Sequence, residues 1–378
     1  MTTLADLRTP ALVLDRSVVA RNTAAMRARA TKHGVRLRPH LKTAKCVEVA
    51  KLATEGQFGG IAVSTLAEAE FFARHGFRDI IYAVGISPGK IADVIALRRE
   101  GVELKVLTDD LGVARELADR ARAAAVRLEA FIEIDCGYGR AGIEPDAPEL
   151  VPIGKALNAP PFLSLAGVLT HAGQSYHTRG EVAVQSAAEE ERASLIRAAA
   201  RLKEAGLPCP TLSVGATPTA TLGRSFEGVS ELRPGNYVFY DLTMHSLGVC
   251  RLEDIAVSVL ATVTGHHHKG GHILIDAGFM ALSKDLGAHD FLPDAGLGFV
   301  MDERCRGRIP GLSVTGVSQE HGKIAVRSTQ DYERLPVGAR VRILPNHICA
   351  TAATFSQYDV VEGPSDQVIE RWARCGGW

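Results

Sequence analysis

Over roughly the first 250 residues, short apolar runs alternate with longer segments in which apolar positions recur at the helical period. Short runs rich in β-branched residues are typical of strands buried on both faces, and the segments between them have the composition of helices. The strands that the pattern predicts are Val35–Pro39, Gly60–Ser64, Asp79–Val84, Leu104–Thr108, Ala130–Asp135, Leu165–His171, Thr211–Val214 and Glu231–Phe239. Eight strands that alternate with helices predict an α/β fold of the (β/α)8 TIM-barrel type. No GxGxxG motif follows an early strand, which argues against an open doubly wound sheet.

Two of the predicted helices carry a start signal. Thr65 is followed three residues later by Glu68, and Ser186 by Glu189, which is the spacing of a capping box. We therefore expect one helix to begin after Thr65 and another, over Ala187–Ala205, to begin after Ser186.

After about residue 250, strand-like runs follow one another with little helix between them. Gly, Pro and charged residues separate these runs, as in turns between antiparallel strands. We predict a barrel domain over residues 15–250 and a second, mostly β domain over residues 251–378, which the strand-like segment 9–14 is expected to join. The strands expected in the second domain are Ala256–Thr264, His272–Ile275, Gly311–Val317, Lys323–Val326 and Arg340–Leu344.

The charge and cysteine content of the chain indicate which kinds of partner and which cellular compartment to expect. Lys plus Arg and Asp plus Glu both number 43, and a formal net charge of zero argues against nucleic acid or an anionic membrane surface as the main partner. No apolar run approaches the length that crosses a bilayer, and the N-terminus lacks the basic start and apolar core of a signal peptide. The 7 cysteines are widely and irregularly spaced, without a CxxC motif, which is typical of a reducing compartment. We therefore expect a cytoplasmic protein with no nucleic-acid or membrane partner.

Lys42 follows the first predicted barrel strand. Barrel enzymes place catalysis at the C-terminal ends of their strands, and a lysine that is desolvated there has a lowered pKa and can form a Schiff base. The alternative is a solvated surface lysine, which is our expectation for the nearby Lys45.

Four further segments at the ends of later strands combine glycines, hydroxyls and side chains suited to anions or aromatic rings. Glycines permit close backbone approach, and small and hydroxyl residues after strands seven and eight form the usual phosphate site of such barrels. Each segment alone could be an ordinary turn, but four of them at successive strand ends indicate one site. The segments are Asp135–Gly142 with Arg140, Thr170–Tyr176 with His171 and Tyr176, Ser213–Thr219 with Gly215 and Thr217, and Arg233–Tyr237 with Gly235 and Asn236.

Near the C-terminus, His347 and Cys349 stand two positions apart. On a strand, residues i and i+2 face the same side, so both could bind one metal ion in the same active centre as the lysine. The alternative is a buried structural cysteine beside a hydrogen-bonded histidine.

These segments together are similar to the D-serine dehydratase and D-threonine aldolase family. The resemblance extends over nearly the whole chain and rests on Arg38–Lys42, Thr170–Gly173, Gly215–Thr219 and Pro345–Cys349. The family consists of pyridoxal phosphate (PLP) enzymes with an alanine-racemase-like barrel. The resemblance implies that Lys42 bonds to the cofactor and that His347 and Cys349 bind a divalent metal. It also implies that Gly215, Thr217, Gly235 and Asn236 hold the phosphate, that Arg140, His171 and Tyr176 surround the ring, and that the protein is a homodimer.

The metal pair bears on the reaction. Aldolases of this family tend to have His-x-Asp, whereas this chain resembles the dehydratases in having His-x-Cys. A thiolate is a soft ligand that suits zinc, although Mn²⁺ or Mg²⁺ remains possible. The resemblance is greatest to enzymes that convert D-serine or D-threo-3-hydroxyaspartate to a 2-oxo acid and ammonia, and D-threonine is a further possible substrate.

Four alternatives remain. A D-threonine or 3-hydroxy-D-aspartate aldolase would release glycine and an aldehyde from the same site. An amino-acid racemase needs a second acid or base and no metal pair. A non-catalytic PLP-binding protein is usually a barrel alone, and a PLP-free zinc hydrolase would need more His and Asp ligands at the strand ends.

Overall fold

The computed structural model describes residues 2–55 and 60–378. The chain forms two compact units. We call one the barrel unit, which comprises Ala25–Lys45, Ala53–Gly235 and Cys375–Trp378, and the other the β unit, which comprises Met1–Ala24, Cys46–Leu52 and Asn236–Arg374. Helices α1 (Arg16–Lys32) and α2 (Val47–Thr54) each contribute residues to both units.

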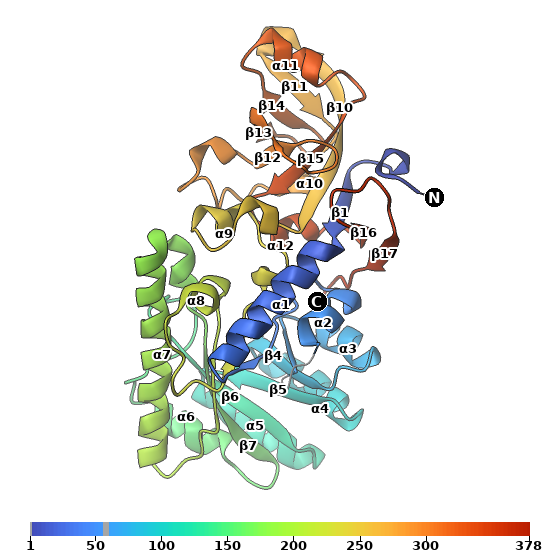
Figure 1. Cartoon of the computed structure of the whole chain (residues 1–378). Coiled ribbons are helices and arrows are strands. Elements are labelled where there is room, and N and C mark those ends of the chain that lie inside the picture. The colour runs from blue at the N-terminus through green and yellow to red at the C-terminus, as the bar shows by residue number, and fades with distance from the viewer. Residues whose placement is uncertain (1, 56–59) are drawn as a thin grey trace. The chain divides into compact units, whose positions relative to one another are not determined.

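The barrel unit is built around an 8-stranded parallel sheet (Figure 1) with the order β2-β9-β8-β7-β6-β5-β4-β3. A parallel bridge between His40, just after β2, and Ala62 in β3 closes this sheet into a ring. The predicted TIM barrel is therefore confirmed. The strands are β2 (Arg36–Leu37), β3 (Ile61–Val63), β4 (Asp79–Gly85), β5 (Glu103–Thr108), β6 (Leu128–Ile134), β7 (Leu163–Thr170), β8 (Thr211–Val214) and β9 (Glu231–Leu232).

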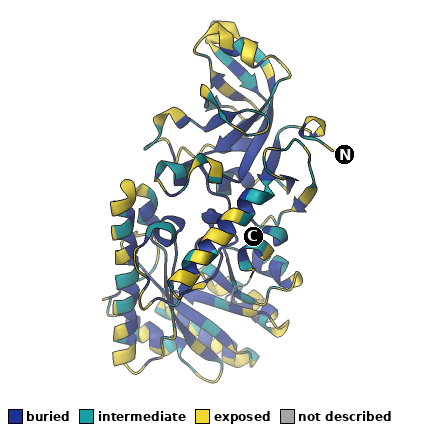
Figure 2. Cartoon of the chain, in the orientation of Figure 1, coloured by how far each residue is buried: buried dark blue, intermediate teal, exposed yellow. Residues whose placement is uncertain are grey.

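Helices follow the strands and cover the outside of the barrel. The longest described, α7, has a small-residue face that is buried and an outer face that is exposed along its length (Figure 2). This amphipathic pattern explains why the helix lies against the sheet. The helices of the barrel unit are α3 (Leu66–Arg74), α4 (Ile91–Arg99), α5 (Leu111–Ala124), α6 (Leu150–Leu157), α7 (Gly180–Glu204) and α8 (Thr217–Leu222), with the short 3-10 helices η2 (Pro88–Lys90) and η3 (Gly173–His177).

The structure confirms one predicted helix start and contradicts another. The Thr65 side chain accepts a hydrogen bond from the Glu68 amide, 3.0 Å away, and so caps α3. Ser186 caps nothing, because α7 already begins at Gly180 and Ser186 lies inside it, where its spacing to Glu189 has no capping role. The last predicted barrel strand is also too long, because β9 ends at Leu232, and Pro234 lacks the amide hydrogen that would extend a strand ladder.

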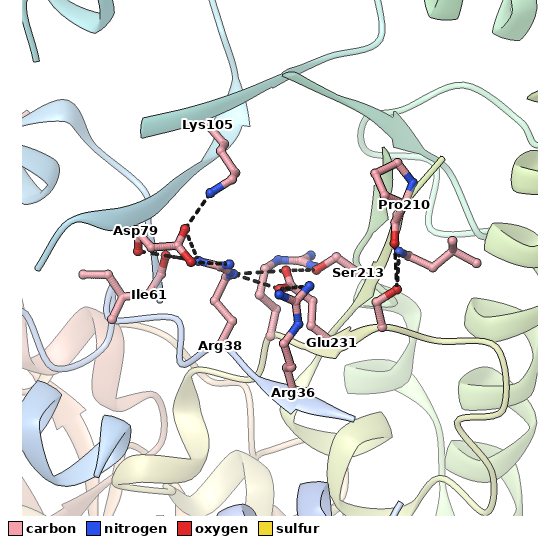
Figure 3. A network of polar contacts seen from close by, with 11 residues as sticks. Arg36, Arg38, Ile61, Asp79, Lys105, Pro210, Ser213 and Glu231 are labelled. Carbon is pink, nitrogen blue, oxygen red and sulfur yellow. Dashed lines mark hydrogen bonds and ion pairs between the residues drawn. The ribbon is translucent and has the colours of Figure 1, made fainter. Parts of the chain in front are cut away.

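Charged side chains inside the barrel unit form a network of ion pairs (Figure 3). Arg38 is buried and lies 3.0 Å from both Glu231 on β9 and Asp79 at the start of β4. Lys105 on β5 lies 2.7 Å from Asp79, and the Ser213 hydroxyl on β8 donates to Glu231 over 2.7 Å. Because the loss of one partner would leave the others without a counter-charge, this network links the strands that it joins.

The β unit contains a 9-stranded sheet with the order β11-β14-β13-β12-β15-β10-β1-β16-β17. The long β10 also pairs with β11, which closes the strands from β11 to β10 into a second, antiparallel ring. The N-terminal strand β1 pairs antiparallel with β10 and parallel with β16. The strands are β1 (Ala11–Asp15), β10 (Val257–His267), β11 (His272–Ile275), β12 (Gly298–Met301), β13 (Arg308–Val317), β14 (Gly322–Ala325), β15 (Arg340–Pro345), β16 (Gln357–Val361) and β17 (Glu370–Ala373).

Short helices connect the strands of the β unit. They are α9 (Leu242–Ser246), α10 (Phe279–Leu282), α11 (Thr329–Arg334) and α12 (Ile348–Ala352), with the 3-10 helices η1 (Leu4–Asp6), η4 (Asn236–Val238), η5 (Leu252–Asp254), η6 (His268–Gly270) and η7 (Pro293–Ala295). Throughout residues 2–55 and 60–378, no helix combines the length and the apolar character needed to cross a membrane.

Candidate active site

Lys42 lies in the turn that follows the ring-closing residue His40, as predicted for a lysine just past the first barrel strand. Its neighbours Leu41 and Thr43 are fully buried, whereas the Lys42 side chain is exposed. The two buried neighbours anchor the turn, and the side chain of Lys42 between them is not desolvated in this structure. An exposed amine can be reached by an incoming ligand.

Lys45 also differs from expectation. It is not a solvated surface lysine, because its ammonium group lies 3.0 Å from the carboxylate of Glu68, which is completely buried. Of these two lysines, Lys45 neutralises a buried charge of the fold, and Lys42 has the exposed side chain suited to chemistry.

Positive charge gathers around Lys42 in the barrel unit. Burial, Lys42 and the nearby guanidinium groups of Arg140 and Arg233 together lower the pKa of His171 to about 3. Burial and the charges of Lys42 and Arg233 also lower the pKa of His40 well below its usual range. Both imidazoles are consequently neutral at pH 7, and the cationic surroundings favour an anionic ligand.

The orientation of His171 is fixed by a backbone contact. Its Nδ1 atom lies 2.6 Å from the carbonyl oxygen of Gly215. Because a carbonyl only accepts, Nδ1 carries the hydrogen of the neutral ring and Nε2 has the free lone pair. The ring centre of Tyr176 is 6.1 Å from that of His171, at an angle of 42°. The structure therefore brings His171, Tyr176 and Gly215 together, as predicted.

The two glycines of the predicted phosphate site sit where the backbone is crowded. A Cβ atom on Gly215 would lie 2.6 Å from the backbone nitrogen of Arg233, and one on Gly235 would lie 2.9 Å from the carbonyl oxygen of His40. Thr217, the first residue of α8, is fully buried. Small residues thus let the ends of β2, β8 and β9 approach one another beside Lys42.

Arg140 is exposed and its guanidinium group lies 5.5 Å from the ring centre of the exposed Tyr138. It contributes charge to the surroundings of His171 and His40, and this long-range effect is what connects it to the other predicted residues.

Two residues with no predicted role support this site. Glu191 on α7 is buried, and its carboxylate accepts hydrogen bonds from the amides of Ala172 and Gly215, both at 3.0 Å, and from the Thr219 hydroxyl at 2.7 Å. It therefore holds the residue after His171 and the glycine that His171 contacts. No sequence signal distinguishes Glu191 from the exposed Glu190 beside it.

Arg233 is the second such residue. It is buried and donates to the Ser213 hydroxyl and the Thr170 carbonyl, both at 2.7 Å. Its Nε atom is buried without a hydrogen-bond partner among the described residues. Since an unpaired buried donor is costly, this atom is a candidate contact for a bound polar group.

Asn236, the last of the predicted phosphate residues, belongs to the β unit. It begins η4, and its Nδ2 atom donates to Oδ2 of the buried Asp241 over 2.6 Å. Its Oδ1 atom is buried without a hydrogen-bond partner in the part of the chain that the structure describes.

The predicted metal pair also lies in the β unit, but not on a strand. β15 ends at Pro345. His347 is the residue just before α12 and makes no capping hydrogen bond through its side chain, and Cys349 lies in the first turn of that helix. The strand ends because the Asn346 carbonyl accepts hydrogen bonds from the Thr243 amide and hydroxyl, which diverts the chain from the sheet. The prediction that strand alternation aligns the pair is therefore wrong, and the helix start brings the two side chains together.

The chemistry of the pair fits a zinc ion. Nδ1 of His347 lies 2.6 Å from Oδ2 of Asp285, and the imidazole is within hydrogen-bond reach of the Cys349 thiol. Burial opposes the charged ring, but these two partners outweigh it and raise the pKa of His347 to about 11. Asp285, which no sequence spacing links to His347, would occupy Nδ1 and leave Nε2 for a metal.

No group of three or more His, Cys, Asp or Glu side chains arranged for a metal occurs within residues 2–55 and 60–378. A zinc ion on His347 and Cys349 would therefore take its other ligands from water or substrate, as catalytic zinc ions do with their open positions.

Family models match both the N-terminal and the C-terminal part of the chain. Residues 14–243 match the N-terminal domain of alanine racemases, and residues 256–361 match a putative serine dehydratase domain. The chain is 44% identical to the D-threo-3-hydroxyaspartate dehydratase of Delftia sp. (strain HT23), over 100% of this chain and 99% of that one. It is 34% identical to the D-serine dehydratase of Dictyostelium discoideum, over 99% and 98% of the two chains.

A solved structure of D-threo-3-hydroxyaspartate dehydratase, a cysteine-to-alanine variant in the metal-free form, superimposes with a TM-score of 0.96. The two chains are 44% identical, and the match covers 100% of each. These full-length matches show that this chain belongs to the D-serine dehydratase and D-threonine aldolase family of PLP-dependent, alanine-racemase-like lyases.

Proposed function

We propose that the protein is a PLP- and zinc-dependent dehydratase that converts a D-amino acid with a β-hydroxyl group to a 2-oxo acid and ammonia. D-threo-3-hydroxyaspartate, D-serine and D-threonine are the candidate substrates. The observation that carries the proposal is the full-length similarity to D-threo-3-hydroxyaspartate dehydratase in a chain that retains a His-x-Cys pair.

The residues of the barrel unit fit PLP. Lys42 offers an exposed amine for the aldehyde, and the cationic surroundings suit the phosphate and phenolate. We assign the phosphate to Gly215, Thr217 and Gly235 of the barrel unit and to Asn236, the next residue of the chain, which belongs to the β unit. We assign the ring to Arg140, His171 and Tyr176. When bound, PLP delocalises the negative charge that forms at Cα of the substrate.

The role of Lys42 follows from its chemistry. With PLP and a substrate bound, the amine of Lys42 would be the base that accepts the proton from Cα of the substrate. The neutral His171 adds no positive charge there and presents Nε2 as a hydrogen-bond acceptor. Because Lys42 stands at one fixed strand end, it approaches the substrate from one face, which accounts for selectivity towards one enantiomer.

The residues of the β unit fit zinc. His347 and Cys349 supply the nitrogen and sulfur ligands that zinc prefers, and a thiolate suits Mn²⁺ or Mg²⁺ less well. When bound, zinc acts as a Lewis acid that makes the β-hydroxyl a better leaving group. We further propose a cytoplasmic homodimer, with the barrel function in residues 15–250 and the metal function in residues 251–378.

The proposal is tested by product analysis with D-threo-3-hydroxyaspartate, D-serine and D-threonine in the presence of PLP and zinc. We expect 2-oxo acid and ammonia, with loss of product after chelation and in Lys42→Ala. Lys51→Ala, which removes an exposed lysine on α2, is the matched control and should retain activity.

Other products would identify another reaction. Glycine and an aldehyde would indicate an aldolase. Formation of the L-amino acid would indicate a racemase, and bound PLP without turnover of any substrate would indicate a binding protein.

A further inference from the structure

Asp241 is a fully buried carboxylate of the β unit that joins three segments of the chain. Its Oδ1 atom accepts a hydrogen bond from the Met244 amide at 3.0 Å and caps α9. Its Oδ2 atom accepts from Nδ2 of Asn236 at 2.6 Å and from the amide of Ile348 at 3.1 Å. A single oxygen therefore connects Asn236 with the start of α12.

The position of Ile348 gives this contact its significance. Its amide belongs to the peptide between His347 and Ile348, and Cys349 is the next residue. Moving this peptide would change the directions of both proposed metal ligands. Asn236, at the other end of the connection, is a proposed phosphate ligand.

A second contact makes the connection stiff. The helix that Asp241 caps contains Thr243, whose amide and hydroxyl donate to the Asn346 carbonyl at 3.1 and 2.8 Å. The Asn346 side chain is buried and donates to the Gly296 carbonyl at 2.7 Å. The residue just before His347 is thus held from two sides, and α9 cannot shift without moving it.

Helix capping alone does not explain a buried carboxylate at this position. Asn or Ser caps a helix as well as Asp does, without placing a negative charge in the interior. The cap uses only Oδ1, whereas the two remaining donors, Asn236 and Ile348, share Oδ2. The bridging contact is therefore the feature that requires an acid.

We propose that Asp241 couples the occupancy of the phosphate site to that of the metal site. A ligand that fixes Asn236 also fixes Oδ2 of Asp241, and with it the peptide that directs His347 and Cys349. The inference rests on the proposed function, because it takes Asn236 as a ligand of PLP and His347 with Cys349 as ligands of zinc. Thermodynamic linkage requires the effect to be reciprocal: zinc tightens PLP binding by the same factor as PLP tightens zinc binding.

Two binding titrations on the full-length protein test this coupling. The affinity for PLP is measured from the absorbance of the bound cofactor, in chelator-treated protein with and without added zinc. The affinity for zinc is measured by competition with a chromophoric chelator, with and without PLP. We expect the same factor in both experiments, of about fivefold or more.

Asp241→Asn should abolish the coupling, so that zinc no longer changes the affinity for PLP and PLP no longer changes the affinity for zinc. The new amide can still cap α9 through its oxygen, but its nitrogen cannot accept from both Asn236 and Ile348. If the Asn236 amide turns over to accept from the new nitrogen, Ile348 still loses its partner. Asp110→Asn is the matched control, since Asp110 caps α5 through Val113 in the same way and is exposed; the coupling should persist there.

Equal PLP affinity with and without zinc in the unmodified protein would overturn the inference, as would coupling that persists in Asp241→Asn. If Asp241→Asn does not fold, as judged by circular dichroism, Asp241→Ser replaces it, because a serine hydroxyl can cap α9 but is too short to bridge. Failure of the unmodified protein to bind PLP or zinc at all is a different result, and it would refute the proposed function as well.

Discussion

Nδ1 of His347 lies 2.6 Å from Oδ2 of Asp285, a contact between residues 62 positions apart in the chain. Because a carboxylate only accepts hydrogen bonds, Nδ1 of His347 carries a hydrogen in this contact, and a metal ion would take the place of the hydrogen on Nε2. The Cys349 thiol is a second hydrogen-bond partner of the same ring. Asp285 therefore orients the ring of a proposed metal ligand.

Removing this carboxylate should weaken metal binding. We expect Asp285→Ala to lower the affinity for zinc by about 10- to 100-fold, because the imidazole loses both its fixed orientation and part of its basicity. Zinc competition with a chromophoric chelator measures the change, and Asp93→Ala, on the exposed side of α4, is the control. An unchanged zinc affinity in Asp285→Ala would mean that the contact does not serve metal binding.

Glu191 should control the geometry of the His171 segment. In Glu191→Ala, three buried donors lose their acceptor, so we expect a loss of stability of about 3 kcal/mol and a PLP affinity at least about tenfold lower. Glu191→Gln keeps an oxygen for the two amides and should retain most of the affinity. The absorbance of bound PLP and urea unfolding measure the two effects, and Glu190→Ala serves as the exposed control. A PLP affinity in Glu191→Ala equal to that of the control would reduce Glu191 to a purely structural role.

Gly215 should tolerate no side chain. A Cβ atom there would lie 2.6 Å from the backbone nitrogen of Arg233, and two backbones cannot separate without disturbing β8 and β9. Gly215→Ala should therefore destabilise the protein by about 1–3 kcal/mol and weaken PLP binding. Gly89→Ala is the matched control, because open space surrounds its Cβ position. Equal unfolding temperatures for the two variants would contradict the conclusion that the backbone of Arg233 leaves no room for a side chain at Gly215.

Asp79 should make stability depend on pH in the acidic range. Burial opposes ionisation, but Arg38 and Lys105 outweigh it and lower the pKa of Asp79 from 3.8 to about 2. A carboxyl with a lowered pKa stabilises the fold above its ordinary pKa, and this stabilisation is lost as the pH falls towards the lowered value. The free energy of unfolding of the unmodified protein should thus exceed that of Asp79→Asn by at most about 2 kcal/mol near pH 7. This difference should shrink between pH 4 and pH 2. Urea unfolding at several pH values measures it, with Asp93→Asn as the control; a difference that stays constant with pH would show that the ion pairs do not set this pKa.

The sequence pattern was sufficient to predict the barrel and to place Lys42 just past its first strand. Short apolar runs define strands locally, and the catalytic residues of barrel enzymes follow the C-terminal ends of the strands. It was misleading where tertiary contacts override local pattern. His347 and Cys349 are close together because Thr243 diverts the chain at Asn346, not because of strand alternation. The helix α7 likewise begins at Gly180, six residues before the signal at Ser186.

The supporting acids could not have been predicted. Glu191, Asp241 and Asp285 have no motif of their own, and each acts through partners distant in the sequence. Only the fold decides which of the 43 acidic residues meets such partners.

The ring of the barrel closes at its weakest point, beside Lys42. β2 has only 2 residues, and beyond it a single bridge, with Leu41 donating to Ala62 and Ala62 to Pro39, joins the first strand to β3. So short a junction should open more often than the rest of the sheet and exchange its amide hydrogens faster. A molecule bonded to Lys42 and held at the neighbouring strand ends would link the two sides of this junction. Slower amide exchange at Leu41 and Ala62 would then show that the molecule has bound, before any turnover.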